Sequence, residues 1–150
     1  SIALIFAGAF PDVPAGVIAM APHEFVEEET LAGISAVKAA WTASDLPHKL
    51  ARHHADAPRV FAEWNDTWLA PAFRDWSIEE YLPAIRCPVL AIQGEDDEYA
   101  TMRQIDIIAE QVSDTMLLKL SHCGHSPHRD QPALVLWAAD TFVRRVAGRP

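Results

Sequence analysis

The feature that most constrains the fold of this chain is the alternation of short apolar runs with segments of helical periodicity. The runs are Gly16–Ala21, Cys87–Gln93 and Met116–Leu120. A short, continuous apolar run that is closed by a turn residue is typical of a parallel strand covered on both faces. Strands that alternate with helices indicate a parallel sheet joined by right-handed crossovers. We therefore predict an α/β fold with about three parallel strands and flanking helices.

Helices are predicted from the composition and spacing of the segments between these runs. Ser1–Phe10 is apolar on every side, which predicts a helix buried between the sheet and other elements. Glu27–Trp41 has an acidic first turn and apolar residues at helical spacing. Met102–Val112 and Pro132–Val146 are also predicted helices, whereas Asp45–Tyr81 is polar, aromatic and irregular in pattern.

The position of the strands predicts two domains. Residues 1–22 and 82–150 contain all the predicted strands and would form the α/β core. Residues 23–81 fall between the first and second strands and would form a helical cap or lid inserted into that core.

Composition excludes several classes of protein. The 150 residues are 50% hydrophobic and 22% charged, as in folded globular proteins. The net charge of −9 argues against binding to nucleic acid or to an anionic membrane, and no apolar stretch approaches the ~20 residues of a membrane span. Two cysteines cannot build a disulfide framework, so we expect reduced thiols and a cytoplasmic location.

Ionisable residues follow two of the predicted strands directly. Gln93–Asp97 follows the second strand, and Ser121–Pro127 follows the third. In open α/β sheets, reactive groups lie just beyond the carboxyl ends of the strands. Asp97 and His125 are therefore predicted to meet there as a catalytic pair, in which the carboxylate orients the imidazole and stabilises its protonated form. Asp96 is the alternative acid, and a loop-capping aspartate with a surface histidine is the structural alternative.

At these residues the chain resembles the α/β-hydrolase family. Pro88–Asp97 is similar to the strand and G-x-x-D acid motif of that family, and Leu120–His128 with Gln131-Pro132 is similar to its histidine loop. The order of aspartate before histidine also matches the family order of serine, acid and histidine. The resemblance extends over essentially the whole chain and implies the C-terminal part of the α/β-hydrolase core with its cap.

The nucleophile that the resemblance requires is missing from the sequence. The family places it in G-x-S-x-G at a sharp strand-to-helix turn, and neither Gly33–Val37 nor Gly124–His128 matches that pattern. Ser126 is also followed by Pro127, which has no N–H to donate to an oxyanion. Ser1–Phe10 resembles the helix after the nucleophile turn, so we expect a truncated chain whose serine lies just upstream of Ser1. Ser1 itself as an N-terminal nucleophile is the alternative.

The resemblance implies a parent enzyme that hydrolyses an ester, thioester or related acyl bond, with His125 as general base and then acid and Asp97 as its partner. It implies no cofactor and no metal, and a zinc site at His122, Cys123, His125 and His128 is not expected because no second ligand cluster exists. The chain alone is expected to be inactive. Dehalogenase, epoxide hydrolase or carbon–carbon bond hydrolase chemistry, a small-molecule-binding module and an inactive fragment are the alternatives.

Aromatic residues of the predicted cap are candidates for substrate binding. Trp41, Trp64 and Trp68 are predicted to line an apolar substrate pocket, although packing of the cap explains them equally well. His23-Glu24 follows the first strand and either faces the active site or forms a plain turn, and His53-His54 is predicted to lie on the surface. Besides a small-molecule substrate, we expect the missing N-terminal half of the fold or a second copy of the chain as partner, because the first strand would otherwise keep an open apolar edge.

Overall fold

A computed structural model of the chain describes residues 1–148, which form two compact units. Unit 1 consists of Ser1–Phe25 and the chain from Ser77 onward, and unit 2 consists of Val26–Trp76. Among residues 1–148, every helix is either too short or too polar to cross a bilayer.

The described part of unit 1 contains a sheet of three parallel strands in the order β1-β2-β3. They are β1 (Val17–Met20), β2 (Val89–Gly94) and β3 (Thr115–Leu120), which confirms the predicted α/β fold. The central strand β2 is buried along its whole length. Its register places Ile92 opposite Met20 and Gly94 opposite Leu120, so the carboxyl ends of all three strands lie at the same edge.

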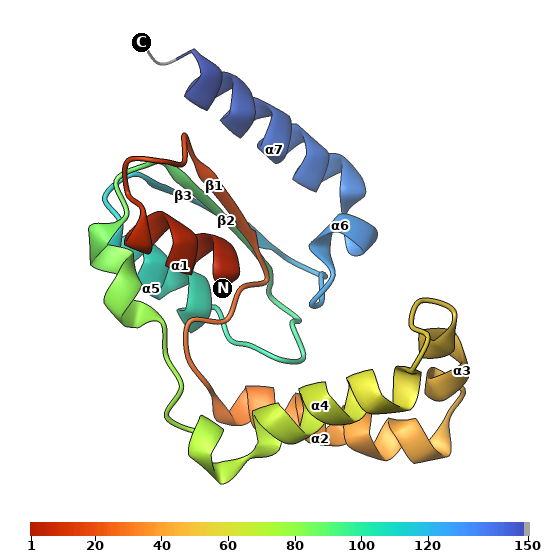
Figure 1. The fold of residues 1–150 in the computed structure, drawn as a ribbon. Coiled ribbons are helices and arrows are strands. Elements are labelled where there is room, and N and C mark those ends of the chain that lie inside the picture. Colours follow the sequence, from red (N-terminus) through yellow and green to blue (C-terminus); the bar gives the residue numbers. More distant parts are fainter. Residues whose placement is uncertain (149–150) are drawn as a thin grey trace. The chain divides into compact units, whose positions relative to one another are not determined.

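Helices cover both faces of this sheet (Figure 1). On one face, α7 (Pro132–Ala147) packs on the strands, after the short helix α6 (Pro127–Asp130). On the other face lie α1 (Ile2–Ala9) and α5 (Arg103–Gln111). The core beneath α7 is made of aliphatic, sulfur and aromatic side chains: Leu90, Ile92, Leu120, Cys123, Val135, Ala138 and Phe142.

The predicted burial of the first helix on every side is wrong. In α1 only Leu4, Ala7 and Gly8 are buried, whereas Ile2 is 84% and Phe6 is 44% exposed. The reason is that one stripe of the helix faces β1 and the 3₁₀ helix η2 (Glu79–Ala84), and the opposite stripe faces away from the described residues of unit 1. The contact with η2 needs Gly8, because a Cβ there would lie 2.3 Å from the carbonyl oxygen of Tyr81.

Unit 2 is helical, including the region whose sequence pattern is irregular. It contains α2 (Glu28–Ala43), α3 (Leu46–Ala51), α4 (Ala57–Leu69) and the 3₁₀ helix η1 (Pro71–Phe73). Two of these helices, α3 and α4, lie in the part of the predicted helical cap whose pattern did not indicate where helices begin and end. Pro47 and Pro58 interrupt the pattern but lie in the first turns of these helices, where the missing N–H of proline costs nothing. Asp56 caps α4 by accepting a hydrogen bond from the Arg59 N–H.

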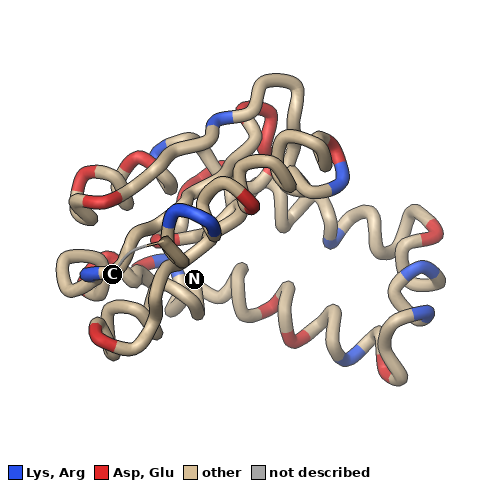
Figure 2. Tube along the Cα trace, turned by 90° about the horizontal axis from the view of Figure 1, so that it is seen from above, with Lys and Arg blue, Asp and Glu red and all other residues tan. Residues whose placement is uncertain are grey.

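Basic and acidic residues alternate along the helices of unit 2 (Figure 2), and several of them form ion pairs. Arg59 contacts Asp56 and Glu63 on α4, and Lys38 of α2 contacts Asp66 of α4 at 3.0 Å. All of these side chains are more than half exposed. Such exposed pairs contribute little to stability, so the packing of unit 2 depends on its apolar residues.

Candidate active site

The candidate site is built at the carboxyl ends of β2 and β3, where two loops lie against each other. Gly94 ends β2 with so little room that a Cβ would lie 2.0 Å from the carbonyl oxygen of Cys123. This close approach lets the Glu95 N–H bond to Leu120 O at 2.9 Å and the Asp96 N–H bond to Cys123 O at 3.0 Å. The glycine of the G-x-x-D pattern is therefore required for docking the acid loop on the histidine loop.

Asp97 and His125 are brought into direct contact by these loops. The Nδ1 atom of His125 lies 3.0 Å from both carboxylate oxygens of Asp97. The Asp97 side chain is completely buried, and its Oδ1 also accepts the Tyr99 N–H at 2.9 Å. The His125 side chain stays 32% exposed. The predicted contact between the two residues is thus present, and a hydrogen bond from Nδ1–H to the carboxylate leaves Nε2 as the proton-accepting nitrogen.

Asp96, the alternative acid, makes no such contact in the described structure. Its backbone N–H bonds to Cys123, and the residue is exposed. Gln93 supports Asp97 from the strand end: it is fully buried, and its Nε2 donates to the carbonyls of Ala100 and Thr101 at 3.1 Å and approaches Asp97 Oδ2 at 3.5 Å. These bonds fix the turn that carries the acid.

Two further carboxylates hold the backbone of the histidine loop, and the sequence analysis missed both. Glu98 Oε2 accepts the His125 N–H at 3.2 Å, and Asp130 Oδ2 accepts the Gly124 N–H at 2.9 Å. Two consecutive backbone N–H groups are therefore bound by carboxylates, one from the acid loop and one from α6. The position of Glu98 directly after Asp97 was the available sequence signal for this role. It was not enough, because an acidic residue in a loop is usually an ordinary surface residue.

The charges around His125 favour its protonated form. The pKa of His125 is raised, mainly by the hydrogen bond to Asp97; burial acts in the opposite direction, and the charges of Asp97 and Glu98 add to the increase. The ring of Tyr99 contacts His125 edge-on with centroids 4.8 Å apart, and burial raises the pKa of this phenol. His125 is thus placed in surroundings that stabilise an imidazolium, as a general base requires.

An open, polar pocket of about 390 Å³ lies beside the imidazole. It is lined by the loop and α6 residues Glu98, Gly124, His125, Ser126, Arg129 and Asp130. The ring of His23, which follows β1, lies 5.8 Å from that of His125, and the neighbouring Glu24 is fully buried with its N–H bonded to Gln104 Oε1 at 2.7 Å. His23 thus lies beside the catalytic candidate His125, and Glu24 is a buried residue of the segment that follows β1.

Residues 1–148 contain no group of three His, Cys, Asp or Glu side chains placed to hold a metal ion. Both cysteines, Cys87 and Cys123, are buried free thiols. Burial is the main cause that raises the pKa of each thiol.

The three candidate tryptophans all lie in unit 2 and fall into two aromatic clusters. Trp41 stacks on Phe61 with centroids 4.1 Å apart, and Trp64 is tilted against the same ring at 6.0 Å. Trp68 instead contacts Phe73 and Trp76. Trp64, unlike Trp41 and Trp68, lines a pocket of unit 2 together with His54. His53 and His54 are both exposed.

Comparison with known proteins gives matches in structure alone, since neither known sequence families nor curated proteins match the chain. VinJ superimposes with a TM-score of 0.64 at 19% identity, covering 97% of this chain and 62% of VinJ. Proline iminopeptidase from Mycobacterium smegmatis gives a TM-score of 0.64 at 18% identity, with 97% and 62% covered. A thermophilic esterase from Thermogutta terrifontis gives 0.60 at 20% identity, with 97% and 61% covered.

The chain therefore spans less than two thirds of the length of these similar structures. All of them share one fold, and nearly the whole of this chain superimposes on each. The described residues thus form part of an α/β-hydrolase fold.

Proposed function

We propose that Asp97 and His125 are the acid and the histidine of a catalytic triad in a hydrolase that cleaves an ester or related acyl bond. The observation that carries this proposal is the 3.0 Å contact between His125 Nδ1 and the fully buried Asp97 carboxylate at the carboxyl end of the sheet. In open α/β sheets this edge is where ligands bind.

The proposed reaction uses His125 twice. As a serine hydroxyl attacks the substrate carbonyl, His125 Nε2 takes its proton, and Asp97 stabilises the resulting imidazolium. The imidazolium then protonates the leaving alcohol or thiol, which gives an acyl-enzyme. In the second half, His125 Nε2 removes a proton from water while the water oxygen attacks the acyl carbon. The imidazolium then returns that proton to the serine oxygen as the carboxylic acid leaves. The proposed reaction needs neither a metal nor a cofactor.

Glu98 has a positioning role in this proposal. Its carboxylate accepts the backbone N–H of His125 at 3.2 Å, so it fixes the histidine loop against the acid loop. Its negative charge also contributes to the raised pKa of His125. Asp130 holds the preceding residue, Gly124, by accepting its backbone N–H.

The nucleophile is proposed to be a serine supplied by a segment outside these 150 residues, because the sequence has no G-x-S-x-G. An aspartate in that position would instead support dehalogenase or epoxide hydrolase chemistry. On this proposal the 150-residue chain by itself has no turnover, and the cytoplasm is the expected location of the intact gene product.

Unit 2 is proposed to be the cap, with Trp41, Trp64 and Trp68 as its candidates for substrate contact. Its apolar pocket also favours a second candidate function, a module that binds a small molecule without catalysis. The two functions differ in whether bound substrate is turned over.

The open edge of β1 is proposed to pair with a further strand of the intact protein. In the described residues β1 pairs with β2 alone, and Ile18 on this strand is 36% exposed. Beside it, α1 exposes Ile2 and Phe6. The 150-residue chain alone should therefore self-associate in size-exclusion chromatography with light scattering, and a stable monomer would contradict this part of the proposal.

The test of the proposed function uses the intact gene product, with whatever is encoded on either side of these 150 residues. A fluorophosphonate probe should label one serine outside residues 1–150, and p-nitrophenyl esters should be hydrolysed. The variant His125→Ala should lose labelling and about 10⁴-fold or more in kcat. Turnover that survives His125→Ala would overturn the triad, and binding of esters without turnover in the unmodified protein would favour the second candidate.

A further inference from the structure

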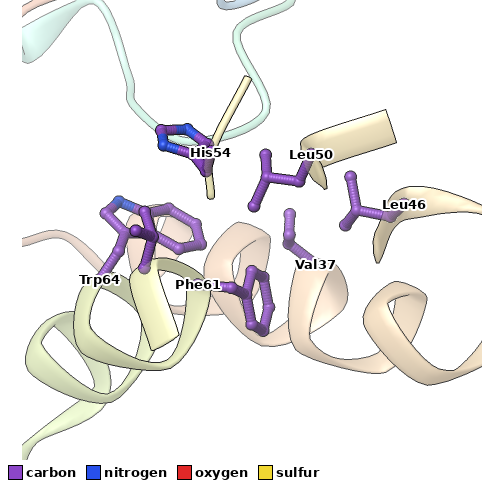
Figure 3. Close-up of a pocket in the computed structure, with 7 residues that line it drawn as sticks. Val37, Leu46, Leu50, His54, Phe61 and Trp64 are labelled. Carbon is purple, nitrogen blue, oxygen red and sulfur yellow. The ribbon is translucent and has the colours of Figure 1, made fainter. Parts of the chain in front are cut away.

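Unit 2 contains an apolar pocket of about 270 Å³ between α2, α3 and α4 (Figure 3). The pocket shares no lining residue with the polar one beside His125, and its lining belongs entirely to unit 2. Six lining side chains are apolar and one is a histidine; the lining residues are Val37, Leu46, Leu50, His54, Val60, Phe61 and Trp64.

The aromatic wall of this pocket is held in place from behind. Phe61 is 8% exposed and stacks on Trp41 with an interplanar angle of 10°. One turn further along α4, the buried Asn65 donates to the carbonyl of Ile34 at 3.1 Å and so ties α4 to α2. The ring stack and this hydrogen bond thus join α2 and α4, the two helices that border the pocket.

The mouth of the pocket combines one polar group with an exposed aromatic surface. Trp64 is 39% exposed although its ring lines the pocket, and His54 is exposed beside it. Figure 3 shows the imidazole of His54 and the indole of Trp64 on the same side of the space, with Leu46, Leu50 and Val37 on the other. His54 is the ionisable side chain among these lining residues, so a ligand with a charged group deep in the pocket would have no counter-charge.

The volume indicates the size of the ligand. An apolar cavity of ~150 Å³ takes up one benzene ring, so a pocket of about 270 Å³ has room for two fused rings. We infer that this pocket binds an uncharged two-ring aromatic compound whose hydroxyl or carbonyl oxygen is turned toward His54. The inference does not depend on the proposed hydrolase function, because it concerns residues of unit 2 alone and is tested without turnover.

The test uses 2-naphthol as the probe and isothermal titration calorimetry on the intact protein. We expect saturable binding with a Kd of about 0.1–1 mM, the affinity reasonable for a ligand of this size. Trp64→Ala should weaken binding about tenfold through loss of ring contact, whereas Trp137→Ala, which removes an exposed indole of α7 that does not line the pocket, should leave the Kd unchanged.

A second matched pair tests the polar end of the pocket. His54→Ala should weaken 2-naphthol about threefold, the effect of one lost hydrogen bond, and His53→Ala should have no effect because His53 does not line the pocket. The variants should fold normally because all four replaced side chains are exposed: Trp64, Trp137, His53 and His54.

A groove of about 380 Å³ beside β1 and α7 is the competing apolar site, lined in part by Ile18, Phe142 and Val143. Nuclear Overhauser effects from 2-naphthol to the methyl groups of Leu50 and Val60 would support the pocket of unit 2. Effects confined to Ile18 and Val143, a Kd unchanged in Trp64→Ala, or no saturable binding up to the solubility of 2-naphthol would each overturn the inference.

Discussion

The loops that carry Asp97 and His125 and the helices of unit 2 both contain many charged residues, but they use them differently. In the loops, the acid is completely buried and contacts a residue 28 positions away in sequence. In unit 2, Arg59 contacts acids three and four positions away on the same helix, and all three side chains are mostly exposed. The comparison indicates that contacts of charged side chains hold the loops in place, whereas packing of apolar side chains holds the helices of unit 2 together.

The largest expected effect on stability is at Gly94, where the two loops meet. Gly94→Ala would place a methyl group 2.0 Å from the carbonyl oxygen of Cys123, a backbone atom that cannot move without breaking the strand end. We expect a loss of about 3 kcal/mol in the free energy of unfolding, measured by urea titration.

Gly124→Ala is the matched control in the facing loop. Its new methyl group would meet the end of the flexible Glu98 side chain at 3.1 Å, so the loss should stay below about 1 kcal/mol. Equal effects of the two variants would show that the close contact at Gly94 does not hold the loops together.

In unit 2 a loss of unfolding free energy as large as that of Gly94→Ala should come from replacing a buried apolar residue. Phe61→Ala removes a buried ring that stacks on Trp41, and it should cost about 3 kcal/mol of unfolding free energy. Trp64→Ala removes a ring on the same helix that is 39% exposed, and it should cost less than about 1 kcal/mol. A larger cost for Trp64 than for Phe61 would contradict the assignment of the packing core of unit 2.

The titration of His125 tests whether the carboxylates of the acid loop act on its imidazole. Since its pKa is raised by Asp97 first and by the charge of Glu98 last, Asp97→Asn should lower the pKa of His125 more than Glu98→Gln does, as measured by NMR titration of the ring. A raised pKa in the folded state means that the protonated form is stabilised. The contribution of His125 to folding stability is complete below the ordinary histidine pKa of ~6.5 and is lost as the pH rises through the raised pKa. An unchanged His125 titration in Asp97→Asn would contradict the contact.

The smallest effect is expected for the ion pair between Lys38 and Asp66. Both side chains are more than half exposed, although they connect α2 and α4. A double-mutant cycle with Lys38→Ala and Asp66→Ala should give a coupling energy of about 0.5 kcal/mol or less, decreasing further at high salt. A coupling energy above about 2 kcal/mol would mean that this ion pair also holds α2 and α4 together.

The sequence was sufficient where periodicity and strand order decide the outcome. The three strands follow from their apolar runs, and the meeting of Asp97 with His125 follows because parallel strands end at the same edge of the sheet. A helical cap was predicted for residues 23–81, but the bounds of α3 and α4 within it were not, because Pro47 and Pro58 resemble breaks in the sequence although they lie in first turns. The exposure of Ile2 and Phe6 depends on what covers α1, which its own composition does not indicate.

The supporting carboxylates of the site were beyond prediction for a different reason. Glu98 and Asp130 act through side chains that reach backbone N–H groups of another loop. Which donors such a side chain reaches depends on the relative placement of the loops to within an ångström, and spacing along the chain does not determine that. The acid and the histidine could be predicted, whereas the residues that hold them required coordinates.

The measurement that tests the central claim most directly compares Asp97→Asn with Asp96→Asn in the intact protein, with kcat for a p-nitrophenyl ester as the readout. Both variants exchange a carboxylate for an amide of the same shape, but only Asp97 contacts His125. We expect Asp97→Asn to lower kcat by about 10³–10⁴-fold because the imidazole loses its partner and its tautomer, and Asp96→Asn to change it by less than about threefold. Equal losses in the two variants, or normal turnover in Asp97→Asn, would contradict the assignment of Asp97 and His125 as a catalytic pair.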